Sequence, residues 1–197
     1  KKNGYKKSLV AGIICLAVAI LTFCSLLMPW WTYKAETQTL KRTIEFKLQG
    51  AVITEENPKT TKAESYQGTA IEGVYSTTYY AAIAAVLLAI ISLICSVSAA
   101  AGKASNKIAF CPVLLALVLT VFTPLYFALA LPNALAQGVF PGMFSGIEYR
   151  FNGVSEAGDI SWGPAIGWYL LVLACILTAI AAIATVISKT VKERAEI

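Results

Sequence analysis

Four long apolar runs without a single charged side chain constrain this chain more than any other feature. They are Ser8–Trp30, Thr78–Ala101, Ile108–Leu131 and Trp162–Ser188. Each exceeds the roughly 20 residues with which an α-helix crosses the hydrocarbon core of a bilayer. The chain is 57% hydrophobic and only 14% charged, whereas a soluble domain is about 25% charged. We therefore expect an all-α bundle of four transmembrane helices.

Basic residues are distributed unevenly between the segments that flank these runs. The short segments 1–7, 102–107 and 189–197 are rich in Lys and Arg, whereas acidic residues match or outnumber basic ones in 31–77 and 132–161. Because short cytoplasmic loops carry an excess of Lys and Arg, both termini are expected in the cytoplasm. Both long segments are then extracytoplasmic, in a multi-pass protein of the plasma membrane. The net charge of +5 belongs to this pattern, and no nucleic-acid partner is expected.

The first long segment, 31–77, has the pattern of β-strands. Apolar and polar residues alternate from Leu40 to Gln49, which is typical of a strand with one buried face. We expect further strands at 51–54 and at 66–75, and a fourth at 147–151 in the second long segment. Because a lone exposed strand would leave its ladder unpaired, these strands are predicted to form one small antiparallel sheet.

Several residue types inside or beside the helices favour close packing. Ala81, Ala85 and Ala89 lie four residues apart, and small residues at this spacing let helix backbones approach in lipid. Pro124 has no backbone N–H and is expected to kink the third helix. The residues that we expect to shape the join between sheet and bundle are Trp30, Trp31, Trp162, Gly163, Gly167 and Trp168.

Residue types that carry common chemistries are missing from the chain. It has no histidine, no phosphate-binding or dinucleotide-binding glycine motif, and no charged residue inside the apolar runs. All five cysteines fall within or at the edge of those runs, where packing is their ordinary role. We therefore expect no catalytic residue, no metal site and no cofactor.

Two short motifs accompany this layout. The first is Leu27-Met28-Pro29-Trp30-Trp31, at the end of the first apolar run, and the second is Gly163–Trp168, at the start of the fourth. With four helices, inside termini and a strand-rich first outer segment, they resemble the claudin and peripheral-myelin-protein superfamily. The chain departs from claudins in lacking the Trp-x-Gly-Leu-Trp motif and the cysteine pair of their first outer loop. The resemblance implies a left-handed four-helix bundle capped by an outer sheet.

The expected function is non-catalytic contact between membrane proteins. The chain would be an accessory subunit of a larger membrane complex, or a contact protein that assembles with copies of itself as claudins do. Its expected partners are the bilayer, bound lipids, and other membrane subunits or copies of itself. The alternative is a channel or transporter component whose pore forms between protomers.

Overall fold

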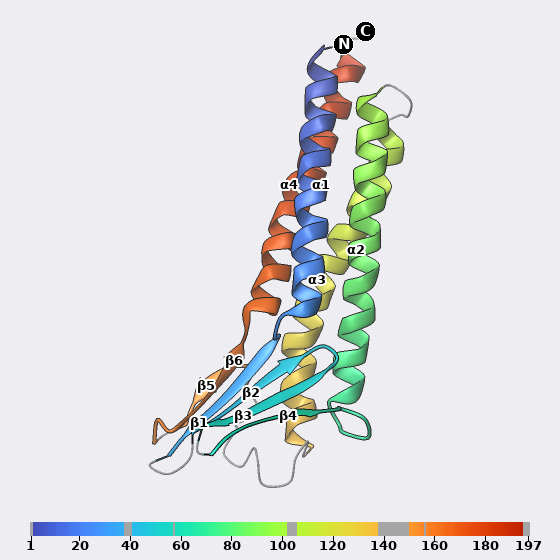
Figure 1. Cartoon of the computed structure of the whole chain (residues 1–197). Coiled ribbons are helices and arrows are strands. Elements are labelled where there is room, and N and C mark those ends of the chain that lie inside the picture. The colour runs from blue at the N-terminus through green and yellow to red at the C-terminus, as the bar shows by residue number, and fades with distance from the viewer. Residues whose placement is uncertain are drawn as a thin grey trace. The chain divides into compact units, whose positions relative to one another are not determined.

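A computed structural model describes residues 2–37, 41–56, 58–101, 106–137, 150–155 and 157–194. The helices are α1 (Lys2–Leu27), α2 (Glu72–Ala100), α3 (Asn106–Ala136) and α4 (Ile166–Arg194) (Figure 1). The strands are β1 (Trp31–Glu36), β2 (Lys41–Lys47), β3 (Gly50–Glu56), β4 (Lys59–Glu64), β5 (Gly153–Val154) and β6 (Ile160–Pro164). All four helices are long and apolar enough to cross a membrane. The predictions of four such helices and of an antiparallel sheet are confirmed.

The chain divides into two compact units. The helical unit comprises Lys1–Phe23, Ala81–Phe122 and Leu170–Ile197, and the sheet unit comprises Cys24–Tyr80 and Thr123–Tyr169. Each unit contains stretches that are far apart in sequence, so each depends on long-range packing.

Small side chains occupy the buried positions of the helical unit. On α2 these positions are spaced alternately by three and four residues, which is the heptad spacing of left-handed helix packing. The same spacing recurs on the other three helices. The buried positions with this spacing are Ala11, Cys15, Val18 and Thr22 on α1, Ala82, Ala85, Ala89, Ser92 and Ser96 on α2, Val113, Ala116 and Thr120 on α3, and Leu171, Ala174, Thr178 and Ala181 on α4. Gly12, Ala19 and Ala182, each next to one of these positions, are also buried.

Most of the buried hydroxyl groups of this unit are bonded to their own helix. Thr22 donates to the Val18 carbonyl at 2.8 Å, and Thr178 donates to the Ala174 carbonyl at 2.7 Å. Such bonds satisfy a hydroxyl without any partner from another helix. These hydroxyl groups therefore need no hydrogen-bond partner from a neighbouring helix.

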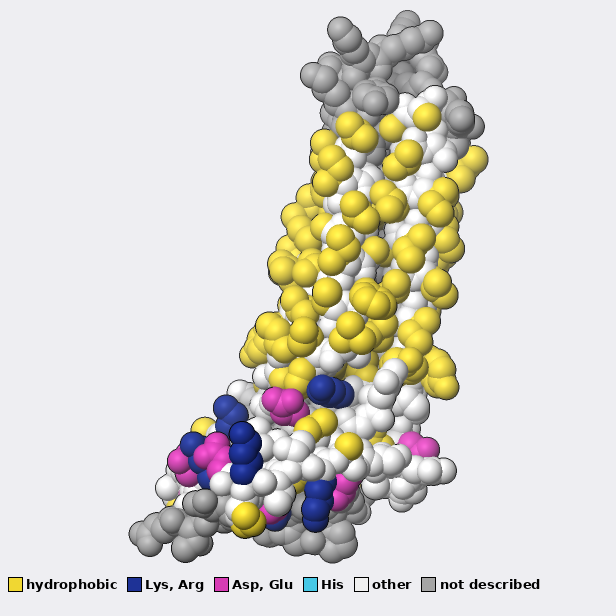
Figure 2. Space-filling view, in the orientation of Figure 1, with side chains coloured by type: hydrophobic (Ala, Val, Ile, Leu, Met, Phe, Trp, Pro, Cys, Tyr) yellow, Lys and Arg dark blue, Asp and Glu magenta, His cyan; other side chains and the backbone are white. Residues whose placement is uncertain are grey.

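Large apolar side chains point outward from the same helices. Ile13, Val118 and Ile183 are 61%, 61% and 60% exposed. In Figure 2, hydrophobic side chains cover the visible face of the helices, whereas basic and acidic side chains gather over the sheet. Small residues inside and large apolar residues outside reverse the arrangement of a water-soluble bundle, and this is the arrangement that helices use in lipid.

The sheet unit contains one six-stranded antiparallel sheet in the order β4-β3-β2-β1-β6-β5. The central strand β1 pairs with β2, where Trp31 lies opposite Phe46, and with β6, where Tyr33 lies opposite Trp162. Side chains alternate across a strand, so the apolar residues share one face. That buried face carries Trp31, Tyr33, Ile44, Phe46, Ala51, Ile53 and Trp162.

Aromatic rings form the core beneath the buried face. Phe46 stacks on Tyr66, Tyr66 packs against Tyr75 with ring centroids 4.3 Å apart, and Tyr75 meets Phe127 edge to face at 5.2 Å. Phe127 in turn meets Trp30 edge to face at 5.2 Å. Aromatic pairs add about 0.5–1.5 kcal/mol each beyond their buried area, so this row of rings stabilises the unit.

The opposite face of the sheet, which we call the open face, is largely polar. A row of short side chains and one lysine crosses five strands at equivalent register positions. This row consists of Ser161, Lys34, Thr43, Thr54 and Thr61. Beside it, Lys41 forms ion pairs with Glu36 at 3.7 Å and with Glu56 at 3.5 Å. None of these side chains is buried.

Two of the predicted strands are observed, and one prediction is wrong. The strands expected in 40–49 and 51–54 correspond to β2 and β3. Residues 66–75 form no strand but a turn followed by the start of α2. Thr69 and Glu72 have the Thr-x-x-Glu spacing of a capping box, and the Glu72 carboxylate accepts a hydrogen bond from the Gly68 N–H at 2.7 Å. Gly68 has a φ of +76°, which ends the extended chain there.

The fourth predicted helix also starts too early. Residues 160–164 form strand β6, because Trp31 and Tyr33 of β1 hold them in the sheet, and α4 begins only at Ile166. Strand β1 itself was not predicted. Of the strand expected at 147–151, residues 147–149 lie outside the described residues, and the paired residues nearby are Gly153 and Val154.

Candidate functional site

The four tryptophans of the chain all lie in the sheet unit, and each donates its indole N–H to a backbone carbonyl. The acceptors belong to connections and helix turns rather than to the sheet ladder. The bonds run from Trp30 to Ser25 at 2.8 Å, from Trp31 to Phe151 at 2.8 Å, from Trp162 to Arg150 at 3.1 Å, and from Trp168 to Pro124 at 3.1 Å. We call these four tryptophans, with Gly167, the tryptophan junction.

Trp30 caps the end of α1. A helix would pair the Ser25 carbonyl with the N–H of residue 29, but Pro29 has no N–H. The fully buried Trp30 indole supplies the missing donor. The backbone N–H of Trp30 also donates to the Phe46 carbonyl at 2.7 Å. Trp30 therefore connects the end of α1 to β2.

Gly167 lies against this helix end. Its N–H donates to the Pro29 carbonyl at 2.7 Å, and the Ala165 N–H donates to the Trp30 carbonyl at 2.9 Å. An added methyl group at Gly167 would lie 2.7 Å from Cδ1 of Trp30 and 2.8 Å from the Pro29 oxygen. Only glycine allows the first turn of α4 to approach so closely.

Trp31 and Trp162 hold the segment around Phe151. Their indoles bond to neighbouring carbonyls of that segment, at Phe151 and Arg150. A methyl group on Gly153 would lie 2.5 Å from Cζ2 of Trp162, so the ring lies directly over the glycine backbone. At Gly163 the nearest atom would be Cβ of Asn152 at 3.3 Å, a tight contact.

The remaining predicted residues lie elsewhere. Pro124 is buried in α3 and accepts the bond from Trp168, while the kink expected there stays a prediction. In the helical unit Ala85 and Ala89 are buried, whereas Ala81 is half-buried and Ala82 occupies the buried position. The packing face of α2 thus follows a spacing of three and four, which differs from the spacing of four that we expected.

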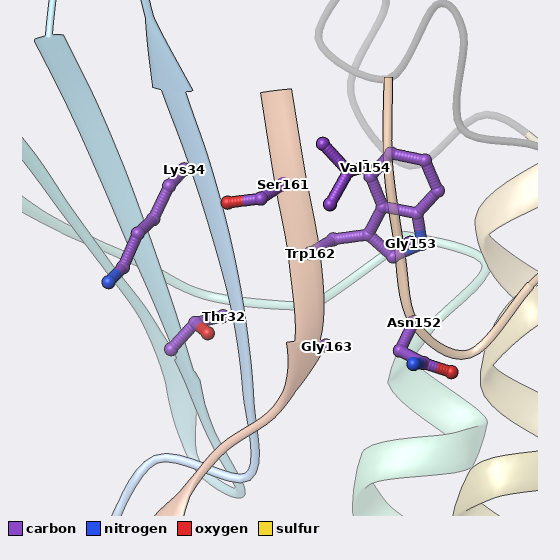
Figure 3. A pocket seen from close by; sticks show the side chains of 8 residues that line it. All are labelled: Thr32, Lys34, Asn152, Gly153, Val154, Ser161, Trp162 and Gly163. Atoms are coloured by element: carbon purple, nitrogen blue, oxygen red, sulfur yellow. The ribbon is translucent and has the colours of Figure 1, made fainter. Parts of the chain in front are cut away.

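A cavity of about 350 Å³ adjoins the junction at β1, β5 and β6. In Figure 3 the Lys34 and Ser161 side chains lie on one side of the β6 ribbon, and the Trp162 ring extends to the other side, beside Val154. Thr32 and Asn152 also line the cavity. Its polar groups are a cation, hydroxyls and an amide, because the Trp162 indole N–H is already bonded to the Arg150 carbonyl.

Outside the four long helices, burial changes the pKa of two tyrosines of the sheet unit. Burial raises the pKa of the Tyr66 phenol well above its ordinary value. Burial also raises the pKa of Tyr33, while Arg42 opposes that shift and Asp159 adds to it. The Tyr66 hydroxyl donates to the Lys47 carbonyl at 2.6 Å. Both phenols are therefore neutral at physiological pH.

Sequence reasoning missed several residues of this site. Phe127, Tyr66 and Tyr75 form the aromatic core, and the Ser25 carbonyl anchors Trp30. The Thr-x-x-Glu sequence at 69–72 could have shown that the segment around Tyr75 is helical. Within the described part of the chain, no group of three His, Cys, Asp or Glu side chains could hold a metal ion.

No family model matches the chain, and a search of curated proteins finds no significant relative.

Proposed function

We propose that this protein is a multi-pass membrane protein that acts without catalysis, through contacts with other membrane proteins. The observation that carries this proposal is the open face of the sheet. It carries a row of four Thr and Ser side chains and Lys34, and the aromatic core of the unit supports it from behind. A rigid surface of this kind loses little conformational entropy when a partner binds.

The outward side chains of the helices support the membrane location. They are large and apolar, and the buried positions hold mostly Ala, Ser and Thr. Lipid tails solvate such an apolar surface, whereas in water a protein with this surface would aggregate. We further propose a plasma-membrane location with both termini cytoplasmic, and membership of the claudin-like tetraspan proteins.

The partner is either a larger membrane complex or further copies of the chain. A pore between protomers is the less supported alternative, because it would have to be lined by outward positions that carry large apolar side chains. Conductance of the reconstituted protein would reveal such a pore.

The experiment is purification from native membranes in a mild detergent, with sizing on a native gel and mass spectrometry of the co-migrating proteins. Thr54→Arg places a long charged side chain within the row of the open face and should release the partner. The control variant Gln67→Arg adds the same charge at an exposed turn and should keep the partner bound. If both variants keep the same partners as the unmodified protein, the open face is not the contact surface.

A further inference from the structure

Four charged side chains of alternating sign cross the open face of the sheet in one row. Glu36 of β1 lies opposite Lys41 of β2, and these two side chains form an ion pair at 3.7 Å. Lys41 also pairs with Glu56 of β3 at 3.5 Å, and Glu56 lies opposite Lys59 of β4. Along the strand order β1, β2, β3 and β4, the charges are negative, positive, negative and positive. We call these four residues the charge row.

The charge row is accessible from outside the molecule. Glu36 is two residues from Lys34, and Lys59 is two residues from Thr61, so they share the open face with the row of Thr and Ser side chains. All four residues of the charge row are exposed. Each of them can therefore meet an opposite charge from a partner without losing its contact within the sheet.

A row of four alternating charges is complementary to itself after half a turn. A two-fold axis that runs along the strands, between β2 and β3, places β1 over β4 of a second copy and β2 over its β3. Glu36 then faces Lys59 of the second copy, and Lys41 faces Glu56 of the second copy. Packed sheets lie about 10 Å apart, and a Lys and a Glu side chain together span that distance.

The rest of the open face is compatible with the same arrangement. Thr32, Lys34 and Glu36 of β1 face Ala63, Thr61 and Lys59 of the second copy, and Lys41, Thr43, Glu45 and Lys47 of β2 face Glu56, Thr54, Val52 and Gly50. No two like charges in this set lie opposite each other. Glu45 alone faces an apolar side chain, and Lys47 lies two residues away on the same face of its strand.

We propose that the partner of the open face is a second copy of this chain, bound face to face about this axis and aligned by the charge row. The inference rests on the proposed function, because it uses the same open face. Exposed ion pairs add little affinity, but they fix the register and exclude wrong partners. A two-fold interface joins one surface patch to itself, and the charge row has the alternation that such an interface requires.

The test uses two single variants, Glu36→Lys and Lys59→Glu. Either variant alone puts like charges opposite each other twice in a dimer, so its self-association should be at least about tenfold weaker. In a mixture of the two variants the introduced lysine faces the introduced glutamate, and every pair of the charge row is again of opposite sign. The mixture should therefore associate about as tightly as the unmodified protein. Energy transfer between donor-labelled and acceptor-labelled copies of the full chain in a mild detergent, followed on dilution, measures each association.

Lys62→Glu is the matched control. It makes the same change of charge on β4, but Lys62 is exposed opposite Ile53 and belongs to the other face of the sheet. Its self-association should equal that of the unmodified protein. Recovery in the mixture would also show that both single variants are folded.

Three results would overturn the inference. They are an unmodified protein that does not associate with itself, unchanged self-association in Glu36→Lys and Lys59→Glu, and no recovery when these two variants are mixed. A native complex that holds one copy of the chain and a different protein, and that Thr54→Arg releases, would overturn the inference but keep the proposed function. Partners that stay bound to Thr54→Arg would instead contradict the open face as the contact surface, so the two failures are distinguishable.

Discussion

Gly167 and Trp30 are so close that a methyl group added to Gly167 would lie 2.7 Å from Cδ1 of Trp30. The Pro29 and Met28 carbonyl oxygens would lie at 2.8 and 2.9 Å from the same methyl group. Two of these three neighbours are backbone atoms, which cannot move away as the end of a flexible side chain could. The start of α4 is therefore fitted to the end of α1 within the sheet unit.

Gly167→Ala should lower the free energy of unfolding in detergent by about 1–3 kcal/mol, the usual cost of overpacking. Gly12→Ala is the matched control, since its added methyl group would find its nearest atoms at 3.6–3.8 Å, an ordinary contact. It should be neutral or slightly stabilising because alanine favours helix. Chemical denaturation measures the free energy of unfolding of both variants. Equal values would contradict the tight contact between Gly167 and the end of α1.

Trp30→Phe should cost about 1–3 kcal/mol beyond its loss of volume, since it leaves the buried Ser25 carbonyl without its indole donor. The cost should shrink in a Pro29→Ala background, where the new amide N–H can serve the same carbonyl. A double-mutant cycle on unfolding free energies measures this coupling. Additive effects would show that the indole does not replace the N–H that proline lacks.

Stability should fall as the pH rises above about 10, the pKa of a tyrosine in an unfolded chain. Burial raises the pKa of Tyr66 in the folded protein, so the unfolded state loses its proton first and is favoured by rising pH. Tyr66→Phe should make the decline less steep. The free energy of unfolding of the unmodified protein and of Tyr66→Phe, measured between pH 8 and about 11, tests this. Equal dependence of that free energy on pH in the two proteins would contradict the burial of the phenol.

Ala85→Leu and Ala89→Leu should each destabilise the helical unit by about 1–3 kcal/mol, because both alanines are fully buried. Ala81→Leu should cost less, since Ala81 is only half-buried. Thermal unfolding in detergent compares the three. A larger cost at Ala81 would favour the face with a spacing of four over the heptad positions.

Much of the fold could be predicted because its signals are local. Strands β2 and β3 follow from the alternation of apolar and polar residues around Ile44 and Phe46, which also lie on the buried face. Strand β1 carries the same alternation in Trp31, Tyr33 and Ala35, but its aromatic residues fitted the interfacial end of a helix equally well. Composition cannot separate a strand from a helix end here, because aromatic rings are buried in both structures.

The four apolar helices follow from the residue pattern alone, since the absence of charge over more than twenty residues admits few other structures. The same sequence pointed to the tryptophans and glycines of the junction, but it did not predict which residues they contact. Tertiary structure decided that Ile160–Pro164 pairs with β1 instead of starting α4, and that Trp30 serves a carbonyl five residues before it. Those outcomes depend on hydrogen bonds and packing between distant segments, which no local pattern encodes.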